Sequence, residues 1–239
     1  MKVMILAAGL GKRMRPLTDQ TPKPLLKVAG RYLIEFHLER LAESGFKEVV
    51  INTHWLGEQL PEALGSGERW GLKIHYAHEP QLLETAGGIQ AALPFLDQDK
   101  HNQPFLVING DVYTELNLKA WLSNAPSLDK QNLAYLALVE NPDHHIKGDF
   151  VLDAETAKLK ILDGSSPSFT YSGVALFHPY FFNGLKAGPS PLAPLLKKYT
   201  QTEQILGGVI SDYWLDVGTP ERFDILQERL NTEVSFLTK

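Results

Sequence analysis

Short apolar runs alternate with amphipathic stretches along the first half of the chain. Runs rich in Val, Ile and Leu predict strands, and apolar positions spaced three and four apart predict helices. Strands are expected at residues 2–6, 48–52, 73–77 and 105–109, and helices at 33–42, 55–64 and 85–93. The third helix is expected to stop before Pro94, because proline disrupts a helix interior. This βαβαβ order predicts an α/β fold, a doubly wound, mainly parallel sheet flanked by helices.

The second half is less regular and contains more strands. Strands are expected at residues 134–139, 150–152, 158–162, 169–177 and 213–217, and helices at 192–199 and 220–230. Residues 150–152 and 158–162 are expected to form a small hairpin. The chain has no repeat, low-complexity segment or evident linker, and 239 residues suit one large α/β domain. We therefore predict a single domain over residues 1–239.

Composition narrows the class of protein. Hydrophobic residues make up 44% of the chain and charged residues 21%, which is ordinary for a globular protein. The formal net charge of −5 argues against general nucleic-acid binding. The absence of cysteine excludes disulfides, a thiol nucleophile and cysteine-ligated zinc. No apolar run approaches the roughly 20 residues that span a membrane, and the N-terminus lacks the apolar core of a signal sequence. The expected compartment is the cytoplasm, with no membrane or nucleic-acid partner.

A glycine-rich loop follows the first predicted strand. Gly9 and Gly11 lack a Cβ, so a ligand could approach the backbone closely there. Lys12 and Arg13 follow at once, which indicates an anionic ligand such as phosphate. Met14 stands where a dinucleotide-binding fingerprint needs a third glycine, and Arg13 stands where a Walker loop needs Ser or Thr. An ordinary turn with a solvated basic patch is the alternative.

Lys23 stands between two prolines shortly after this loop. Pro22 and Pro24 restrict the backbone on both sides of the lysine. Such restriction lowers the entropic cost of holding a side chain toward a ligand. A lone bracketed lysine is ordinary, but next to the glycine-rich loop it supports an anion-binding site.

Two carboxylates lie at the ends of predicted strands. Asp111 follows the buried strand that ends at Asn109, and Asp216 precedes the helix start at Thr219-Pro220. Each could simply cap the segment that follows it. Beside a phosphate site, however, Mg²⁺ characteristically uses one or two carboxylates together with phosphate oxygens. Asp111 and Asp216 are thus the expected metal ligands, with Mg²⁺ as the cofactor.

A third loop, from Glu79, leads into the helix predicted to begin at Thr85. Gly87 and Gly88 lie in the first turn of that helix, where each glycine costs roughly 1 kcal/mol relative to alanine. A flat group lying against the backbone, such as a nucleobase or a sugar, would explain both glycines. Close packing between helices is the alternative.

Together these motifs resemble those of the sugar-1-phosphate nucleotidyltransferases. Leu6-Ala7-Ala8-Gly9-x-Gly11-x-Arg13 and Pro22-Lys23-Pro24-Leu25 match the family signature. Asn109-Gly110-Asp111 and Trp214-x-Asp216-Val217-Gly218 match its two metal-binding segments. The resemblance covers essentially the whole chain, and it implies a Rossmann-like sheet of the nucleotide-diphospho-sugar transferase type with a small β-rich portion for the sugar.

The resemblance also implies roles for the matching positions. Arg13 and Lys23 would be catalytic: Arg13 would neutralise the departing pyrophosphate, and Lys23 would reach the α-phosphate and the sugar phosphate. The expected nucleotide-binding residues are Ala7, Ala8, Gly9, Gly11, Lys12, Arg13, Glu79, Glu84, Thr85, Ala86, Gly87, Gly88 and Asn109. The expected sugar-binding residues are Asn109, Asn141, Gly148, Asp149, Ser172 and Gly173. Residues 1–115 would be mainly the nucleotide-binding part, and residues 116–239 mainly the sugar-binding part with the closing helix.

Features of two loops narrow the implied substrates. The segments at 84–88 and 141–150, with the short length, most resemble enzymes that transfer a uridylyl group from UTP to N-acetylmuramic acid α-1-phosphate in peptidoglycan recycling. His144, His145 and Lys147 are candidates for contacting the lactyl carboxylate of that sugar, although a solvated loop explains them equally well. Because the chain stops after one closing helix, we expect neither a left-handed β-helix domain nor acetyltransferase activity.

Two other functions stay open from the sequence. The protein could use glucose or mannose 1-phosphate with UTP, dTTP or GTP, because the phosphate and metal motifs do not distinguish these substrates. It could also be a non-catalytic sugar-nucleotide sensor on the same fold. The sequence does not decide between a monomer and a small homo-oligomer.

Overall fold

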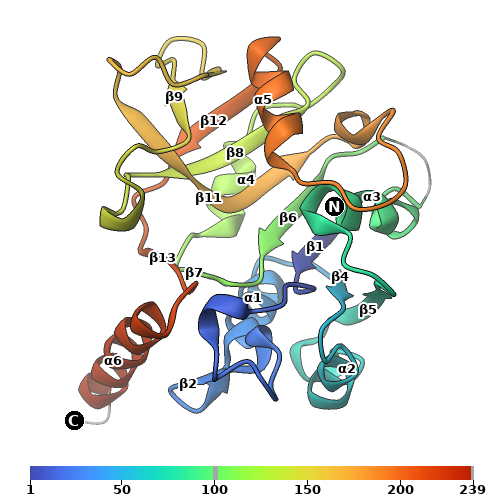
Figure 1. The fold of residues 1–239 in the computed structure, drawn as a ribbon, viewed down its shortest axis with the longest axis vertical. Coiled ribbons are helices and arrows are strands. Elements are labelled where there is room, and N and C mark those ends of the chain that lie inside the picture. Colours follow the sequence, from blue (N-terminus) through green and yellow to red (C-terminus); the bar gives the residue numbers. More distant parts are fainter. Residues whose placement is uncertain (99–101, 238–239) are drawn as a thin grey trace. The chain divides into compact units, whose positions relative to one another are not determined.

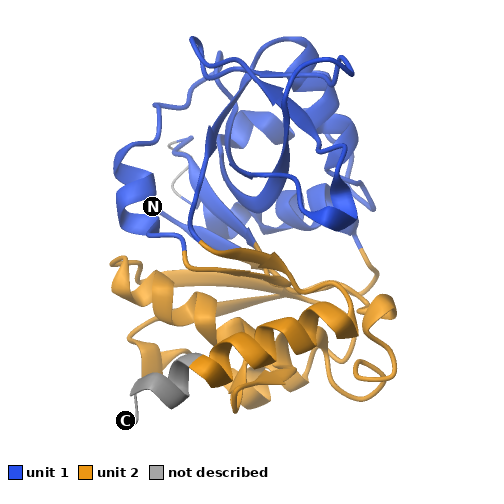
Figure 2. Ribbon diagram, turned by 90° about the vertical axis from the view of Figure 1, so that its left-hand side faces the viewer, with its two compact units in different colours: residues 1–4, 83–108, 116–212 blue, residues 5–82, 109–115, 213–239 orange. Residues whose placement is uncertain are grey.

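The computed structural model describes residues 1–98 and 102–237 (Figure 1). The chain forms two compact units, each assembled from segments that are far apart in the sequence (Figure 2). Unit 1 comprises residues 1–4, 83–108 and 116–212, and unit 2 comprises residues 5–82, 109–115 and 213–239. The single domain expected from the sequence stays a prediction.

The larger sheet is mixed. Its strands are β1 (Val3–Leu6), β4 (Glu48–Thr53), β5 (Lys73–His78), β6 (Phe105–Asn109), β8 (Ala134–Val139), β9 (Phe150–Leu152), β10 (Leu159–Lys160), β11 (Ser168–Phe177) and β12 (Ile205–Val209). Among the described residues its order is β10–β9–β11–β6–β1–β4–β5, with β8 beside β11 and β12 beside β8. β4 and β5 pair in parallel, as do β8 and β12, whereas β11 is antiparallel to β6, β8 and β9.

Helices flank this sheet, and two short ribbons lie outside it. The helices are α1 (Leu33–Glu43), α2 (Gln59–Leu64), α3 (Glu84–Leu96), α4 (Leu118–Ser123), α5 (Ala193–Gln201) and α6 (Pro220–Leu237). One ribbon pairs β2 (Lys27–Val28) with β3 (Arg31–Tyr32), and the other pairs β7 (Val112–Thr114) with β13 (Trp214–Asp216). These elements confirm the predicted α/β class, with helices that flank a mixed sheet. Within the described residues, no helix is both long and apolar enough to cross a membrane.

Two predicted helix boundaries are wrong. The helix expected from residue 55 begins at Gln59, because Leu56 adopts a left-handed φ of 50°, which the interior of an α-helix does not accommodate. The helix expected to stop before Pro94 starts at Glu84 and continues to Leu96. Its last turn persists because Leu96 is buried and the N–H of Asp97 still donates to the carbonyl of Leu93 at 2.8 Å.

Other boundaries also differ, and five elements were not predicted. The strand expected at 158–162 is only Leu159–Lys160, although it pairs antiparallel with β9 as the predicted hairpin requires. The closing helix is longer than predicted and extends to Leu237. The sequence patterns did not predict β2, β3, β7, α4 or β12. β12 contains two glycines, which weaken strand propensity.

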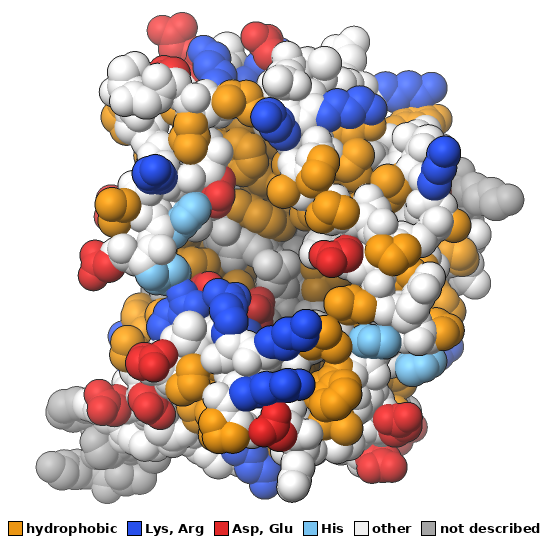
Figure 3. Space-filling view, in the orientation of Figure 1, with side chains coloured by type: hydrophobic (Ala, Val, Ile, Leu, Met, Phe, Trp, Pro, Cys, Tyr) orange, Lys and Arg blue, Asp and Glu red, His pale blue; other side chains and the backbone are white. Residues whose placement is uncertain are grey.

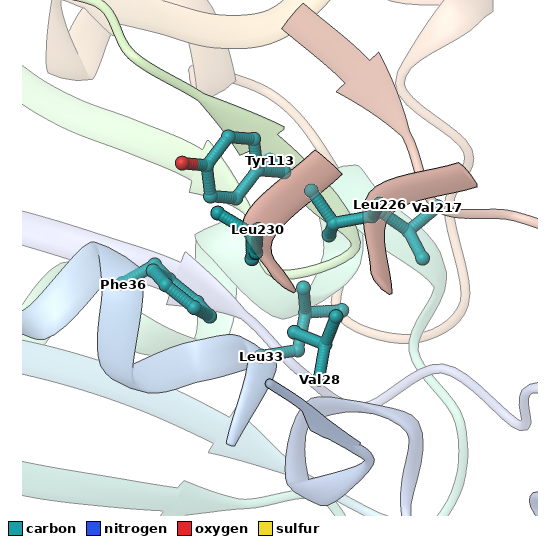
Figure 4. Close-up of a cluster of buried hydrophobic side chains, with 7 residues drawn as sticks. All are labelled: Val28, Leu33, Phe36, Tyr113, Val217, Leu226 and Leu230. Carbon is teal, nitrogen blue, oxygen red and sulfur yellow. The ribbon is translucent and has the colours of Figure 1, made fainter. Parts of the chain in front are cut away.

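A hydrophobic cluster in unit 2 joins α1, α6 and the β7–β13 ribbon (Figure 4). Its buried members are Val28, Leu33, Phe36, Tyr113, Val217, Leu226 and Leu230. Leu33 and Phe36 come from one face of α1, and Leu226 and Leu230 from one face of α6, at the three- and four-residue spacing of an amphipathic helix. Tyr113 and Val217 each lie close in sequence to a predicted metal ligand. The cluster therefore holds the segments that carry those ligands.

α1 also buries a histidine. The side chain of His37 is 2% exposed, and its Nε2 has no hydrogen-bond partner among the described residues. Burial, together with the nearby positive charge of Arg40, lowers the pKa of His37 from 6.5 to about 4. The imidazole is therefore neutral in the folded protein at any pH well above 4.

This pKa predicts that the free energy of unfolding decreases on acidification from pH 6.5 to pH 4. In that range the unfolded chain binds a proton at His37 that the folded chain does not, so the unfolded state gains stability as the pH falls. The contribution is on the order of 3 kcal/mol at full effect, given about 1.4 kcal/mol per pKa unit. Urea titrations at several pH values should show that His37→Gln, which cannot titrate, loses less stability over this range than the wild type. Equal losses for both proteins would contradict the prediction.

Candidate functional site

The glycine-rich loop after β1 is folded around a buried threonine. Thr18 is fully buried, and its hydroxyl donates to the carbonyl of Gly11 at 2.7 Å. Gly11 has a φ of 60°, and a Cβ there would lie 2.8 Å from Cγ2 of Thr18, so glycine is required by the backbone. A Cβ at Gly9, by contrast, would meet no atom within 4 Å. The space beside Gly9 is therefore open, and binding of a ligand there stays a prediction.

Two of the predicted anion-binding cations point outward from the same loop. Met14 is buried at the end of the short 3₁₀ turn Lys12–Met14, whereas the side chains of Lys12 and Arg13 are exposed. Figure 3 shows Lys and Arg side chains gathered over the segment of unit 2 that follows β1. The loop thus presents positive charge to solvent, which suits an anionic ligand.

Lys23 begins a second 3₁₀ turn, Lys23–Leu25. Pro22 and Pro24 restrict the backbone of this turn. The N–H of Leu25 donates to the carbonyl of Pro22 at 2.8 Å, which closes the turn. The side chain of Lys23 is only 9% exposed, and its Nζ donates to Oδ2 of Asp111 at 2.8 Å. The bracketed lysine and the first predicted metal ligand are therefore in direct contact.

The β7–β13 ribbon brings the second predicted metal ligand next to the first. Asp216 pairs with Val112 across the ribbon, and the N–H of Val217 donates to the carbonyl of Asp111 at 2.8 Å. Gly110 also contributes, because a Cβ there would lie 2.6 Å from the carbonyl oxygen of Leu6. The carboxylates of Asp111 and Asp216 are 36% and 25% exposed, so solvent ions can reach both.

These two carboxylates fit a magnesium ion. Oxygen donors are the ligands that Mg²⁺ prefers, and the ion commonly takes one or two carboxylates with phosphate oxygens and water. The described residues contain no group of three or more His, Cys, Asp or Glu that could hold a metal.

A buried amide connects two predicted nucleotide-binding residues in unit 2. The side chains of Asn52 and Glu79 are each 3% exposed. The Oδ1 of Asn52 accepts the N–H of Ala7 at 2.8 Å, and its Nδ2 donates to Oε1 of Glu79 at 2.7 Å. Asn52 thus fixes the backbone of the glycine-rich loop and the carboxylate of Glu79 at the same time.

The start of α3, in unit 1, is held by another part of the chain. The N–H groups of Ala86 and Gly87 donate to the carbonyl of Ser190 at 2.9 and 3.1 Å. A Cβ at Gly87 would collide with the carbonyl oxygen of Gly188. Backbone packing therefore suffices to explain Gly87, without the flat ligand that the sequence suggested. Glu84 has a φ of 61°, a strained conformation for a non-glycine residue, and such strain is often found at ligand-binding loops.

The predicted sugar-binding residues that lie in unit 1 form a hydrogen-bonded cluster. The amide of Asn141 donates to the carbonyl and hydroxyl of Ser168 at 3.1 and 2.9 Å and accepts from Thr170 at 2.8 Å. Gly148 has a φ of 62°, and a Cβ there would lie 2.5 Å from Oδ1 of Asn141. The amide of Asn141 is thus engaged in shaping the loop.

Asp149 and the strand β11 complete this cluster. One oxygen of Asp149 accepts the N–H of Tyr171 at 2.8 Å, and the other lies 3.0 Å from Nε2 of His145. Ser172 is fully buried and accepts the N–H of Val174 at 3.2 Å, and Gly173 has a φ of 83° beside a register shift in β11. His145 is therefore tied to a predicted sugar-binding residue.

The structure groups the predicted site residues in two sets. One set lies in unit 2 and comprises Arg13, Lys23, Asp111 and Asp216. Arg13 and Asp216 approach the same point: a Cβ added to Gly218 would lie 3.1 Å from Nη2 of Arg13 and 2.8 Å from Oδ1 of Asp216. Asn141, Gly148, Asp149, Ser172 and Gly173 lie together in unit 1. Asn109 ends β6, ahead of Gly110 and Asp111.

Sequence reasoning missed two polar residues of unit 2. Asn52 stands at the end of the buried run Val49–Ile51, and a polar residue directly after such a run was an available signal. Arg222, in the first turn of α6, forms an ion pair with Asp216 at 3.2 Å. No pattern distinguished Arg222 from an ordinary surface arginine at a helix start.

Comparisons with known proteins identify the family of the chain. Residues 2–159 match the family model described as Nucleotidyl transferase, and the chain belongs to that family. It is 49% identical over 221 residues to the N-acetylmuramate alpha-1-phosphate uridylyltransferase of Neisseria meningitidis serogroup B, covering 92% of this chain and 94% of that protein. A protein of the same name from Caulobacter vibrioides is 33% identical, with 91% and 92% covered. The predicted family membership is thus confirmed.

Solved structures resemble the fold. HddC from Yersinia pseudotuberculosis has a TM-score of 0.77 and 24% identity, with 96% of this chain and 99% of that chain covered. A UDP-glucose pyrophosphorylase complexed with UDP-glucose has a TM-score of 0.75 and 19% identity, with 97% and 98% covered. At these identities the likeness concerns the fold alone.

We expect Asn52→Asp to weaken nucleotide binding. The new carboxylate cannot donate to Glu79 and places like charges side by side in a buried position, so both Glu79 and the loop at Ala7 should shift. Loss of a hydrogen bond to a charged group corresponds to a rise of about 10-fold or more in the KM for the nucleotide substrate. Steady-state kinetics would measure this rise. The control is Asn117→Asp at the exposed N-cap of α4, where aspartate caps as well as asparagine. Equal KM values for the two variants would exclude this role for Asn52.

Proposed function

We propose that the protein transfers a uridylyl group from UTP to N-acetylmuramic acid α-1-phosphate, giving UDP-N-acetylmuramic acid and pyrophosphate, in peptidoglycan recycling in the cytoplasm. The observation that carries the proposal is the contact of Lys23 with Asp111 beside Asp216 in a nucleotidyl transferase family member. Two relatives support the choice of substrates. Both are named N-acetylmuramate alpha-1-phosphate uridylyltransferase, and both match more than nine-tenths of the chain.

The proposed reaction needs no general base. An oxygen of the sugar phosphate forms a bond to the α-phosphorus of UTP, while the bond from that phosphorus to the oxygen bridging to the β-phosphate breaks. A phosphate monoester has a second pKa of about 6, so the attacking oxygen is already ionised at neutral pH. The main difficulty is bringing two anions together. Positioning and charge neutralisation therefore supply most of the rate.

The charged residues of unit 2 suit these tasks. Lys23 would leave Asp111 to contact the α-phosphate and the sugar phosphate. The exposed Arg13 would neutralise the pyrophosphate as it departs. Asp111 and Asp216 would hold Mg²⁺, which when bound supplies positive charge to the phosphate oxygens.

The nucleotide and the sugar would contact separate residue sets. We propose that Ala7, held by Asn52, and Glu79 contribute to binding the nucleoside, along with the loop at 84–88. The cluster around Asn141 and Asp149 would contribute to binding the sugar, with His145 near the lactyl carboxylate. Because Asn141 is engaged within its own loop, its part would be to shape that loop.

The two alternatives have weaker support. A guanylyl-transferring relative, the mannose-1-phosphate guanylyltransferase catalytic subunit beta of Drosophila melanogaster, is only 26% identical and this chain covers 60% of it. A non-catalytic sensor would not need the full set of Arg13, Lys23, Asp111 and Asp216, and each of these is present.

Pyrophosphate release tests the substrates. With UTP, dTTP and GTP crossed against the 1-phosphates of N-acetylmuramic acid, N-acetylglucosamine, glucose and mannose, we expect kcat/KM to be highest for UTP with N-acetylmuramic acid 1-phosphate. A margin of about 10-fold over other pairs corresponds to one or two specific contacts. A preference for another pair would show that the proposed substrates are wrong. If no pair releases pyrophosphate, the result would favour the non-catalytic sensor.

Substitutions test the catalytic residues. Lys23→Ala, Asp111→Ala and Asp216→Ala should each lower kcat by about 100-fold or more, comparable with the loss of one preorganised electrostatic contact. Lys119→Ala and Asp224→Ala change exposed residues of the same types and should leave kcat within about 2-fold of wild type, since surface substitutions are usually mild. Near-wild-type turnover of any of the first three would remove that residue from the assignment.

A further inference from the structure

Asp216 has a buried cationic partner on α6. Nη1 of Arg222 lies 3.2 Å from Oδ2 of Asp216, and the arginine side chain is only 11% exposed. An arginine near a helix N-terminus is not favoured by the helix dipole, which prefers negative charge there. The position of Arg222 is thus not explained by the helix that carries it.

Gly218 makes room for this guanidinium. A Cβ at Gly218 would collide with Nη2 of Arg222 and would also lie 2.8 Å from Oδ1 of Asp216. Nη2 of Arg13 lies 3.1 Å from the same point. The two arginines and the carboxylate therefore meet around one glycine, which any larger residue would push apart.

Stability alone is a weak reason for this arrangement. Burying an ion pair costs desolvation that its attraction often fails to offset, and hydrophobic replacements are often equally stable. The Nε of Arg222 is buried with no hydrogen-bond partner among the described residues, which adds to that cost. A role in orienting Asp216 would explain why the arginine is present.

Asp111 and Asp216 form ion pairs with different kinds of side chain. Lys23 pairs with Asp111 through a single flexible ammonium, which can move to a phosphate. Arg222 has a rigid, planar guanidinium group, which is enclosed beside Gly218. Its backbone N–H donates to the hydroxyl of Thr219 at 3.4 Å. One partner is suited to exchange and the other to remain in place.

We propose that Arg222 is a positioning residue that fixes the carboxylate of Asp216 for the divalent cation and remains paired with it throughout the reaction. The proposal rests on the proposed function, because that function assigns Asp216 to the cation. Arg222 does not touch the substrate. It acts by limiting the rotation of the Asp216 carboxylate, so that the carboxylate is already oriented when the ion arrives.

Cation binding without turnover tests this role. The Mn²⁺ affinity can be measured by electron paramagnetic resonance titrations, with Mn²⁺ alone and with Mn²⁺ and UTP. It should fall by about 10-fold or more in two variants: Arg222→Met, which keeps the side-chain bulk, and Gly218→Ala, which displaces the guanidinium. Arg222→Lys should recover part of the loss. The Mg²⁺ concentration for half-maximal activity should rise in the same order. The 10-fold threshold follows the effect of losing a residue that orients a metal ligand.

The matched control is Arg229→Met. Arg229 lies on the same helix and pairs with Glu115 at 2.7 Å, so its loss tests the effect of breaking an ion pair of α6 elsewhere. Its Mn²⁺ affinity should equal that of the wild type even if the melting temperature falls.

The opposite outcomes overturn the proposal. Unchanged Mn²⁺ affinity in Arg222→Met would leave Arg222 a purely structural role, and tighter binding would make it a competitor of the cation. A loss in Arg229→Met as large as in Arg222→Met would indicate a general effect on α6. If the wild type releases no pyrophosphate from any substrate pair, the proposed function fails, while the Mn²⁺ titrations still decide whether Arg222 orients Asp216.

Discussion

One short antiparallel pairing, between β7 and β13, determines where charge can be concentrated in unit 2. It sets Asp216 opposite Val112, and the N–H of Val217 donates to the carbonyl of Asp111, so the backbones of two aspartates from distant parts of the sequence become neighbours. Three residue pairs could not hold this position alone, because a two-stranded ribbon is only marginally stable in water. The hydrophobic cluster of α1 and α6 supplies the missing stability, so the positions of Asp111 and Asp216 depend on its apolar contacts.

The sequence was sufficient for features that depend on local pattern. Apolar runs predicted β4, β6, β8 and β11, because a buried strand must be apolar along its length. Glycine and proline motifs predicted the two turns that carry Arg13 and Lys23, because those residues restrict or free the backbone locally. The sequence placed Asp111 and Asp216 at strand ends, and the structure pairs the backbone segments that carry them. Their role as metal ligands stays a prediction.

Other features could not be predicted because they depend on contacts between distant segments. β7 has only three residues, and its identity as a strand is set by its partner β13. α3 continues past Pro94 because Leu96 is buried by tertiary packing. Gly87 is explained by the carbonyl of Gly188, a residue from another part of the chain. Arg222 looks ordinary in the sequence, and its importance appears only when its partner Asp216 is known.

The ion pair between Lys23 and Asp111 has a consequence for selectivity among anions. A phosphate that approaches Lys23 has to compete with a carboxylate already 2.8 Å from the ammonium. An anion that arrives alone therefore gains little, since it must leave Asp111 without a partner in a partly enclosed place. An anion that arrives with a divalent cation gives each member of the pair a new partner at once. Under the proposed function, this ion pair would favour a metal-complexed nucleotide over free inorganic phosphate.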